Sequence, residues 1–272
     1  MARFLRYLAP NAVTSLALLF GLLSMVATHE GRLVDAGWLI IWSVLLDRVD
    51  GFVARTVRGT SSFGVQMDSF ADAINFGVAP SFLVWVSLSS VPALGFDHGI
   101  GRVLLLVACA TWTLANVFRL AKFNVVSEAG PNVFFGVPTT LAAGVLGIWY
   151  LVLHKYSAPG ALLGSSAHFD ELKIFGDWTI GITAWSYLPA AMLVGAFLMV
   201  SNLPTPKLGK LKYKSVTIVV LVSVALGYLC GFARFMPDFM ALMPSTWLVV
   251  SLVWSQVSAQ ARGLRAPPFL PP

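Results

Sequence analysis

The chain has 272 residues, of which 57% are hydrophobic and only 11% are charged, and its formal net charge at pH 7 is +6. Its mean hydropathy is +0.80. A composition this apolar excludes an ordinary soluble domain and is typical of a polytopic membrane protein. We expect membrane lipids, and no nucleic acid, among its partners.

Continuous apolar stretches predict helices that are long enough, at about 1.5 Å per residue, to cross a hydrocarbon core of about 30 Å. The first stretch is followed closely by others, so we interpret it as a span and not as a cleaved signal peptide. The expected fold is all-α, a helical bundle of about eight transmembrane helices in which residues 1–272 form one domain. In chain order the predicted helices are Pro10–Thr28, Asp35–Arg55, Gln66–Ser89, Arg102–Val125, Pro138–His154, Gly181–Ser201, Ser215–Phe235 and Phe239–Ser258.

The basic residues fall mostly on one side of this bundle, which predicts its orientation because short loops rich in Lys and Arg stay in the cytoplasm. With both termini placed inside, the outer side keeps only Arg32, Arg102, Lys155, Lys173 and Arg234. Attraction to anionic lipid headgroups is a second reading of the basic excess. The inner side then carries Arg3, Arg6, Arg55, Arg58, Arg119, Lys122, Lys207, Lys210, Lys212, Lys214, Arg262 and Arg265.

The cysteines and histidines of the chain do not indicate a metal site or an acid–base site. Cys109 and Cys230 lie inside predicted spans, so neither a disulfide framework nor a thiolate metal site is indicated. The predicted topology places the histidines at the outer side, which removes the commonest general base from an inner site. These histidines are His29, His98, His154 and His168.

Four aspartates lie in two pairs on either side of one short turn. Asp47 and Asp50 are three residues apart, and Asp68 and Asp72 are four apart. Residues at these spacings share one face of a helix. The turn at residues 56–63 is short enough to make the two helices antiparallel neighbours, so the pairs are expected to face each other near the inner end of the bundle.

Ionised carboxylates in a spanning helix are unfavourable and usually functional. Four of them held together repel one another unless a positive charge lies between them. Oxygen-only ligands suit Mg²⁺, Mn²⁺ or Ca²⁺, and two such ions can clamp the attacking and leaving oxygens of a phosphoryl displacement. The sequence therefore predicts a pair of divalent cations, with neutralisation by Arg48, Arg55 and Arg58 as the alternative.

Small residues beside the aspartates are consistent with a large phosphorylated substrate. Gly51 and Ala54 leave the inner face of the second helix open, and Arg55 and Arg58 are placed to meet phosphates. Close helix packing is the alternative reading of the glycine.

The pattern Asp47-x2-Asp50-Gly51-x2-Ala54-Arg55-x8-Gly64-x3-Asp68-x3-Asp72 resembles, without a departure, the signature of the CDP-alcohol phosphatidyltransferases. The resemblance implies an integral membrane enzyme, usually a homodimer, that uses two divalent cations, Mg²⁺ or Mn²⁺, to transfer a phosphatidyl group from CDP-diacylglycerol to an alcohol with release of CMP. It also implies that Asp72 is the catalytic base. Candidate contacts to the CDP-lipid are Asn11, Thr14, Gly51, Ala54, Arg55 and Gly64, although helix capping also accounts for Asn11 and Thr14.

Flanking stretches resemble the bacterial phosphatidylserine synthase group of this family and imply serine as the acceptor and the bacterial inner membrane as the location, with the site facing the cytoplasm. They are Pro10–Thr14, Asp68–Pro80, Phe118–Asn124 and Phe135–Thr139. Lys122 stands where many relatives have arginine, which weakens the argument for a bidentate grip.

The acceptor site is expected near the inner end of the fourth helix. Arg119, Lys122 and Asn124 cluster there, and Asn75 follows Asp72 by one turn. Guanidinium donors suit the carboxylate of serine, while the alternative is that Arg119 and Lys122 are interfacial anchors that extend to the headgroups. Glycerol 3-phosphate, an inositol phosphate or choline remain alternative acceptors. A divalent-cation transporter is the rival from another class, and it would place its carboxylates near the bilayer midplane.

Overall fold

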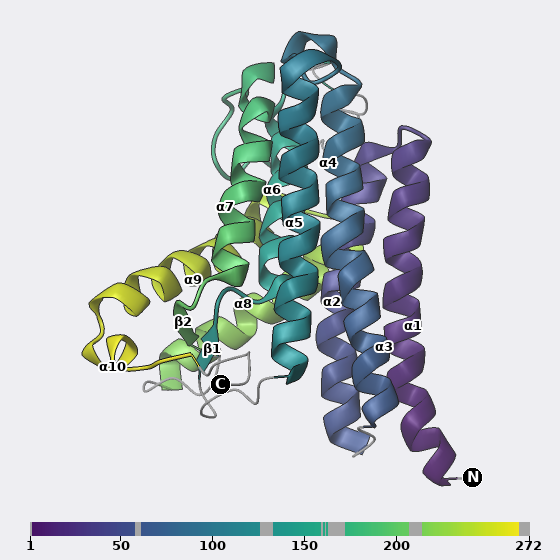
Figure 1. Ribbon diagram of the computed structural model, residues 1–272, viewed down its shortest axis with the longest axis vertical. Helices are drawn as coiled ribbons and strands as arrows, with labels where there is room; N and C mark the ends of the chain where they lie inside the picture. Colours follow the sequence, from purple (N-terminus) through teal and green to yellow (C-terminus); the bar gives the residue numbers. More distant parts are fainter. Residues whose placement is uncertain are drawn as a thin grey trace.

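The computed structural model describes residues 2–57, 61–125, 133–158, 160, 162, 172–206 and 214–266. Within them the chain is almost entirely helical (Figure 1). The helices are α1 (Ala2–His29), α2 (Leu33–Val57), α3 (Ser62–Asp72), α4 (Ala79–Ser89), α5 (Gly99–Val125), α6 (Thr139–Tyr156), α7 (Leu188–Val200), α8 (Lys214–Ala233), α9 (Pro237–Val257) and α10 (Ala259–Arg262). The shorter elements are the π-helical turn η1 (Ala73–Val78), the 3₁₀ turns η2 (Pro92–Leu94) and η3 (Ile182–Tyr187), and the strands β1 (Val133–Phe135) and β2 (Pro204–Pro206).

Each of the eight predicted helices corresponds to helical structure, but the first begins at Ala2 and not at Pro10, the third consists of α3, η1 and α4, and the sixth consists of η3 and α7. The third begins at Ser62, earlier than the predicted Gln66, because the Ser61 hydroxyl caps it by accepting a bond from the Gly64 N–H at 3.0 Å. The antiparallel strands β1 and β2 were not predicted, and they pair Phe134 with Thr205. Each strand has only three residues, which is too short to be predicted from a hydrophobic pattern.

Five stretches of the described residues are long and apolar enough to cross a membrane. The second and fifth predicted spans, α2 and α6, are not among them, and α2 carries Asp35, Asp47, Arg48 and Asp50. The described apolar part of α8, Thr217–Ala233, is shorter. The five stretches are Pro10–His29, Ser62–Ser89, Gly99–Val125, Ile182–Val200 and Pro237–Val257.

The π-helical turn joins α3 to α4 in one continuous rod. Widening the helix frees backbone carbonyls from their regular partners, and α5 supplies the donors for two of them. The Trp112 indole N–H donates to the Phe76 carbonyl at 2.8 Å, and the Thr113 hydroxyl donates to that of Gly77 at 3.2 Å. The π-helical turn is therefore stabilised by α5. A hydrophobic pattern with the regular α-helical period does not reveal such a turn.

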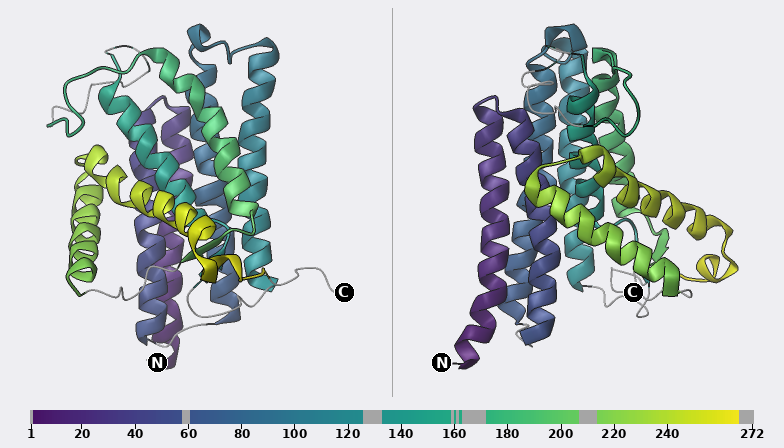
Figure 2. Two further views of the ribbon diagram at one scale, coloured as in Figure 1. Left: turned by 90° about the vertical axis from the view of Figure 1, so that its left-hand side faces the viewer. Right: turned by 180° about the vertical axis from the view of Figure 1, so that it is seen from behind.

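Helices α1 to α7 run roughly along one direction, whereas α8 and α9 are steeply inclined to them (Figures 1 and 2). A buried ion pair fixes this inclined pair to the bundle. The Lys155 ammonium at the end of α6 lies 3.0 Å from the Asp238 carboxylate at the start of α9, and both side chains are 0% exposed. The same carboxylate accepts bonds from the Tyr156 hydroxyl at 2.8 Å and the Ile174 N–H at 2.9 Å.

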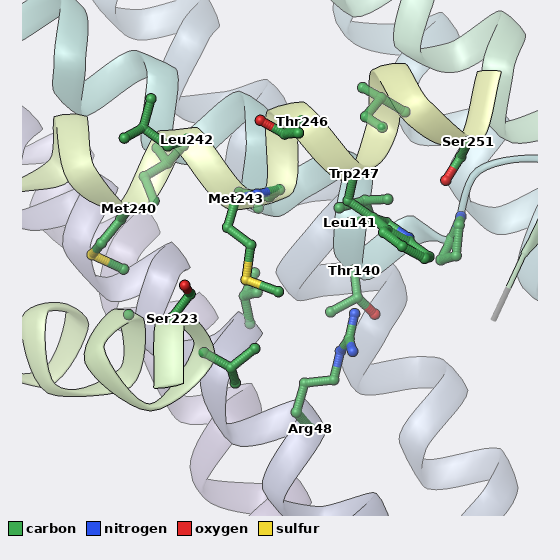
Figure 3. Close-up of a pocket in the computed structure, with 18 of the residues that line it drawn as sticks. Arg48, Thr140, Leu141, Ser223, Met240, Leu242, Met243, Thr246, Trp247 and Ser251 are labelled. Carbon is green, nitrogen blue, oxygen red and sulfur yellow. The ribbon is translucent and has the colours of Figure 1, made fainter. Parts of the chain in front are cut away.

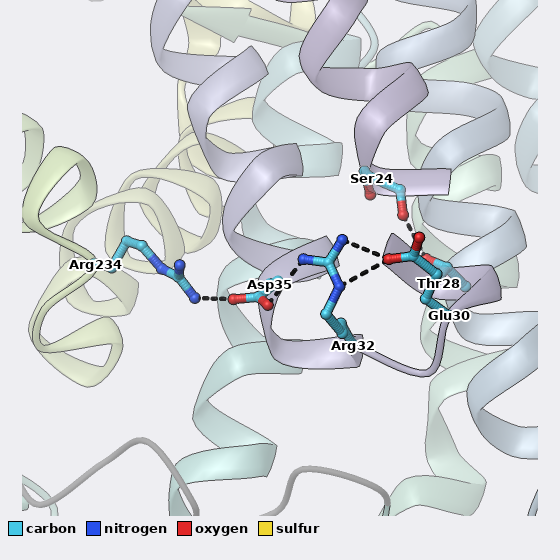
Figure 4. A network of polar contacts seen from close by, with 6 residues as sticks. All are labelled: Ser24, Thr28, Glu30, Arg32, Asp35 and Arg234. Atoms are coloured by element: carbon cyan, nitrogen blue, oxygen red, sulfur yellow. Dashed lines mark hydrogen bonds and ion pairs between the residues drawn. The ribbon is translucent and has the colours of Figure 1, made fainter. Parts of the chain in front are cut away.

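A second polar cluster joins the α1–α2 turn to the α8–α9 turn (Figure 4). Arg32 pairs with Glu30 at 2.6 Å and with Asp35 at 3.2 Å, and Asp35 also pairs with Arg234. These side chains are partly exposed, so the pairs contribute little to stability. The two clusters place the start of α9 beside both α6 and α2.

Candidate metal centre

Three of the four aspartates meet where the end of α2 lies beside α3. One carboxylate oxygen from each of Asp47, Asp50 and Asp68 lies within 4.8 Å of the others. Asp50 is only 6% exposed. The predicted antiparallel arrangement of the two helices therefore brings these side chains to one point.

Asp72 extends the cluster by one helical turn. It is 8% exposed, and its carboxyl group lies within hydrogen-bonding reach of the Asp47 carboxyl group. Two carboxylates in such contact need a shared proton or a cation between them, because like charges repel strongly away from water. All four predicted ligands thus belong to one acidic site.

The donor set fits a hard divalent cation. Its ligands are oxygens from a few carboxylates, which suit Mg²⁺ or Mn²⁺ and leave positions for water or phosphate. A cation bound here would also remove the repulsion among the aspartates.

Two threonine hydroxyls orient the carboxylates from the neighbouring helices. Thr14 of α1 donates to Asp50 Oδ2 at 2.8 Å, and Thr140 of α6 donates to Asp47 Oδ2 at 3.1 Å. Thr14 was predicted at this site, as a lipid contact, whereas Thr140 was not. Thr140 is 93 residues from Asp47 in the sequence. The one feature of the sequence that could have indicated Thr140 is its position directly after the stretch Phe135–Thr139.

Of the other predicted lipid contacts, Asn11 and Gly64 are neighbours. A Cβ added to Gly64 would lie 3.1 Å from Asn11 Oδ1, so the absence of a side chain lets Asn11 approach α3. Gly51 lies on α2 between Asp50 and the end of that helix. The side chains of Ala54 and Arg55 and the whole of Arg58 lie outside the described part of the structure.

Arg119 is buried and not an exposed interfacial anchor. It is 7% exposed, its Nε donates to the Val137 carbonyl at 3.0 Å, and its guanidinium carbon lies 5.7 Å and 5.9 Å from the ring centroids of Phe123 and Phe134. Arg119 therefore fixes the segment that leads into α6, the helix of Thr140.

The other candidate acceptor residues are Lys122 and Asn124 at the end of α5 and Asn75 in η1. Asn124 donates to the Ser69 hydroxyl at 2.8 Å, which places the end of α5 beside α3 next to Asp68. Lys122 donates to Asn202 Oδ1 at 2.7 Å. Asn75 is buried with its side chain against α1, where a Cβ added to Gly21 would lie 2.0 Å from Asn75 Oδ1.

A large cavity adjoins the acidic site on the side of α8 and α9. Its volume is about 590 Å³, and Arg48 and Thr140 line it together with mostly apolar residues of α2, α6, α8 and α9. Figure 3 shows Arg48 and Thr140 close together, with Met243 and Trp247 of α9 entering from the opposite wall. The sequence did not predict this cavity, because its walls come from helices far apart along the chain.

Comparison with known proteins agrees with the motif. Residues 7–170 match the model of the family described as CDP-alcohol phosphatidyltransferase. The chain is 32% identical over 222 residues to a CDP-diacylglycerol–serine O-phosphatidyltransferase of Helicobacter pylori, which is 81% of each protein. It is 30% identical over 169 residues to the protein of that name from Bacillus subtilis, covering 55% of this chain and 89% of that protein. An archaetidylserine synthase of Methanothermobacter thermautotrophicus is 33% identical over 144 residues, covering 52% of this chain and 57% of the relative. The chain therefore belongs to the CDP-alcohol phosphatidyltransferase family.

Proposed function

We propose that this protein transfers the phosphatidyl group of CDP-diacylglycerol to the hydroxyl of L-serine and releases CMP. The observation that carries the proposal is the four-aspartate cluster, in a chain similar over 81% of its length to an enzyme named for this reaction. The cluster provides the chemistry common to the family, and the similarity to serine enzymes favours serine among the acceptor alcohols.

In this mechanism the four carboxylates hold two Mg²⁺ or Mn²⁺ ions. When bound, these ions neutralise the diphosphate and stabilise charge on the departing CMP. Asp72 accepts the proton of the serine hydroxyl. The serine oxygen bonds to the phosphorus of the phosphatidyl group while the bond from that phosphorus to the CMP oxygen breaks. Thr14 and Thr140 keep the carboxylates oriented throughout.

The remaining assignments complete this proposal. Asn11, Gly51, Gly64 and the segment Ala54–Arg55 contact the CDP-lipid, and Asn75, Arg119, Lys122 and Asn124 shape the acceptor site. The protein crosses the bacterial inner membrane eight times, with its termini and the acidic site on the cytoplasmic side, and forms a homodimer. The lipid tails then stay in the bilayer while soluble serine reaches the headgroup at the surface.

An acceptor competition tests the proposed reaction. Purified protein receives CDP-diacylglycerol and Mn²⁺ together with serine, glycerol 3-phosphate, inositol phosphate or choline, and CMP release is measured. We expect serine to support the highest turnover and phosphatidylserine to be the lipid product. Faster release with another acceptor would overturn serine as the substrate while leaving the family chemistry in place.

The threonine contacts give a second prediction. Thr14→Val and Thr140→Val keep the side-chain shape but remove the bonds to Asp50 and Asp47. Loss of a hydrogen bond to a metal ligand typically weakens metal affinity by about 10- to 100-fold. We therefore expect the Mn²⁺ concentration for half-maximal CMP release to rise by about tenfold or more. Ser15→Ala is the matched control, because the Ser15 hydroxyl bonds to the Asn11 carbonyl of its own helix at 2.8 Å. An equal rise in that control would argue against an orienting role.

A third prediction concerns Arg119. Arg119→Lys keeps the charge but loses the planar fork that suits a carboxylate. Loss of one charge-assisted hydrogen bond corresponds to about tenfold in affinity, so the KM for serine should rise by about that factor and more than the KM for CDP-diacylglycerol. Arg102→Lys, in the first turn of the same helix, is the matched control and should leave both KM values unchanged. A larger effect on the lipid KM would assign Arg119 to the donor instead.

A further inference from the structure

The two residues that come shortly before α6, Gly136 and Val137, are bonded through their backbone to other parts of the chain. The Gly136 N–H donates to the Leu203 carbonyl at 2.8 Å, and the Val137 N–H donates to the Leu198 carbonyl at 3.0 Å. Leu198 lies in the last turn of α7, and Leu203 lies in the connection that follows that helix. These bonds tie the start of α6 to the end of α7.

The carbonyls of the same two residues accept bonds from side chains. Arg119 Nε donates to the Val137 carbonyl at 3.0 Å, and the Thr205 hydroxyl donates to the Gly136 carbonyl at 3.1 Å. Thr205 is only 4% exposed, so its bond is shielded from water. All four backbone groups of Gly136 and Val137 thus have partners. We refer to Gly136, Val137 and Thr205 as the α6 clamp.

Gly136 allows this close contact because it has no side chain. Its φ is +82°, in the left-handed region that favours glycine. A Cβ added to it would lie 2.4 Å from the Met199 carbonyl oxygen and 2.8 Å from the Ser201 carbonyl oxygen. Gly136 therefore cannot be substituted without moving the chain, and the contact that can be tested is the Thr205 hydroxyl.

Thr205 is the central residue of β2 and lies between two prolines. Pro204 and Pro206 have no backbone N–H to donate, which leaves β2 with few groups to bond to β1. The Thr205 hydroxyl is a further donor at this point, and its oxygen also lies 3.5 Å from the Phe134 carbonyl oxygen. Figure 1 shows both strands at the end of the bundle where α7 ends. The Thr205 side chain thus provides contacts that the backbone of β2 does not.

The α6 clamp sets the position of the first turn of α6, which carries Thr140. Pro138 follows Val137, and its ring restricts φ, which is −57°. Little freedom is therefore left between the clamp and the helix. The N–H groups of a first helical turn have no acceptor within the helix, and such turns fray. An external anchor is needed to hold Thr140 at 3.1 Å from Asp47 Oδ2.

We propose that Thr205 is a positioning residue for the cation site and acts through Thr140. Its hydroxyl fixes the Gly136 carbonyl, the α6 clamp fixes the first turn of α6, and that turn holds Thr140 against Asp47. The inference rests on the proposed function. It adds to the site a residue of the α7–α8 connection, beyond the residues that match the family model.

The test is the affinity of the purified full chain for Mn²⁺ alone, measured by electron paramagnetic resonance without lipid or serine. Thr205→Val keeps the side-chain shape but removes the hydroxyl. Loss of one hydrogen bond should raise the Kd for Mn²⁺ by about threefold or more. Thr205→Ser keeps the hydroxyl and should keep the wild-type Kd.

Thr28→Val is the matched control, because Thr28 is 0% exposed and its hydroxyl bonds to the Ser24 carbonyl of its own helix at 2.8 Å. Thr28 lies at the opposite end of α1 from Thr14, and the Kd of this variant should equal that of wild type. An unchanged Kd in Thr205→Val, or an equal rise in Thr28→Val, would overturn the inference.

The double variant Thr140→Val, Thr205→Val shows whether the effect passes through Thr140. Substitutions in one chain of contacts are not additive, whereas independent effects on an affinity multiply. We therefore expect the double variant to have the Kd of Thr140→Val alone. A Kd raised by the product of the two single effects would show that Thr205 acts independently of Thr140 and would overturn the proposed role.

Hydrogen exchange of the wild-type protein gives an answer that needs no variant. Because coupling between two sites is reciprocal, Mn²⁺ should slow the exchange of the Gly136 and Val137 amides, which requires local opening of the clamp. The turn η3 should be unaffected. Unchanged exchange in the clamp would overturn the inference even if Thr205→Val failed to fold.

The outcomes for the proposed function are separate. Wild-type protein that binds no Mn²⁺, or that releases no CMP when CDP-diacylglycerol and serine are added, would refute the proposed function itself. Active wild type in which Thr205→Val binds Mn²⁺ as tightly as the unchanged chain would refute only the positioning role of Thr205.

Discussion

Asp72→Ala is expected to lower CMP release from CDP-diacylglycerol and serine by at least about 10³-fold while the protein remains folded. The variant removes both the proposed proton acceptor and one carboxylate of the cation site, and loss of several kcal/mol of transition-state stabilisation corresponds to a reduction of this size. The same outcome is expected for alanine at Asp47, Asp50 or Asp68. The measurement is steady-state CMP release at saturating Mn²⁺ in a detergent-purified preparation.

A suitable control is Asp97→Ala, which removes a carboxylate from the loop before α5, where Asp97 pairs with His98 at 2.8 Å. Its turnover should match that of wild type. Folding of the Asp72 variant is checked by thermal unfolding without divalent ions, where removal of one like charge from the cluster should raise the unfolding temperature. Near-normal turnover by Asp72→Ala would contradict the proposed mechanism.

Asp238→Ala is expected to lower the free energy of unfolding by about 3–5 kcal/mol, the usual effect of removing one partner of a buried ion pair. The substitution leaves the Lys155 ammonium without its counterion in a site that is 0% exposed. It also removes the acceptor of the Tyr156 hydroxyl and the Ile174 N–H. Denaturant titration of the purified protein followed by tryptophan fluorescence measures the change.

The double variant Lys155→Met, Asp238→Leu should recover much of this loss, because well-packed apolar side chains often replace a buried pair without destabilising the fold. Asp35→Ala provides the surface comparison. Its partners Arg32 and Arg234 are 53% and 38% exposed, so the expected loss is less than about 1 kcal/mol. A loss of similar size in Asp35→Ala and Asp238→Ala would show that burial of the pair is not the cause.

The acidic site illustrates what local spacing can predict. The separations of Asp47 from Asp50 and of Asp68 from Asp72 place each pair on one helix face, and the short turn brings the faces together. These are relations between near neighbours in the chain. The same reasoning located helical structure at all eight predicted stretches, because each is largely apolar, but it missed the start of α1 at Ala2 and the 3₁₀ turn η3 that precedes α7.

Features that depend on distant contacts could not be predicted in this way. The bond from Thr140 to Asp47 spans 93 residues, and that from Trp112 to the π-helical turn spans 36. The bond from Arg119 to the Val137 carbonyl is likewise set by how α5 packs against the segment before α6. The start of α9 is tied to the end of α6 by the Lys155 and Asp238 pair, whose members are 83 residues apart.

The position of the cluster also separates the enzyme from a cation transporter. Transporter sites lie near the bilayer midplane on interrupted helices. Here Asp47 and Asp50 lie in the last turns of α2, and Asp68 and Asp72 lie in α3 close after the α2–α3 turn. The family match covers the whole of this region. All four aspartates lie nearer to the α2–α3 turn than to the opposite ends of α2 and of the rod Ser62–Ser89, which suits a lipid headgroup that meets a water-soluble acceptor.

The paired-cation site is tested most directly by a manganese titration in the presence of CDP-diacylglycerol. Bound Mn²⁺, measured by electron paramagnetic resonance, and CMP release on addition of serine are followed in the same samples. We predict about two Mn²⁺ per chain, with turnover rising as the second ion binds and both signals reduced in Asp68→Asn. Full turnover in chelator-treated protein that holds no divalent ion would contradict the proposed role of the aspartates.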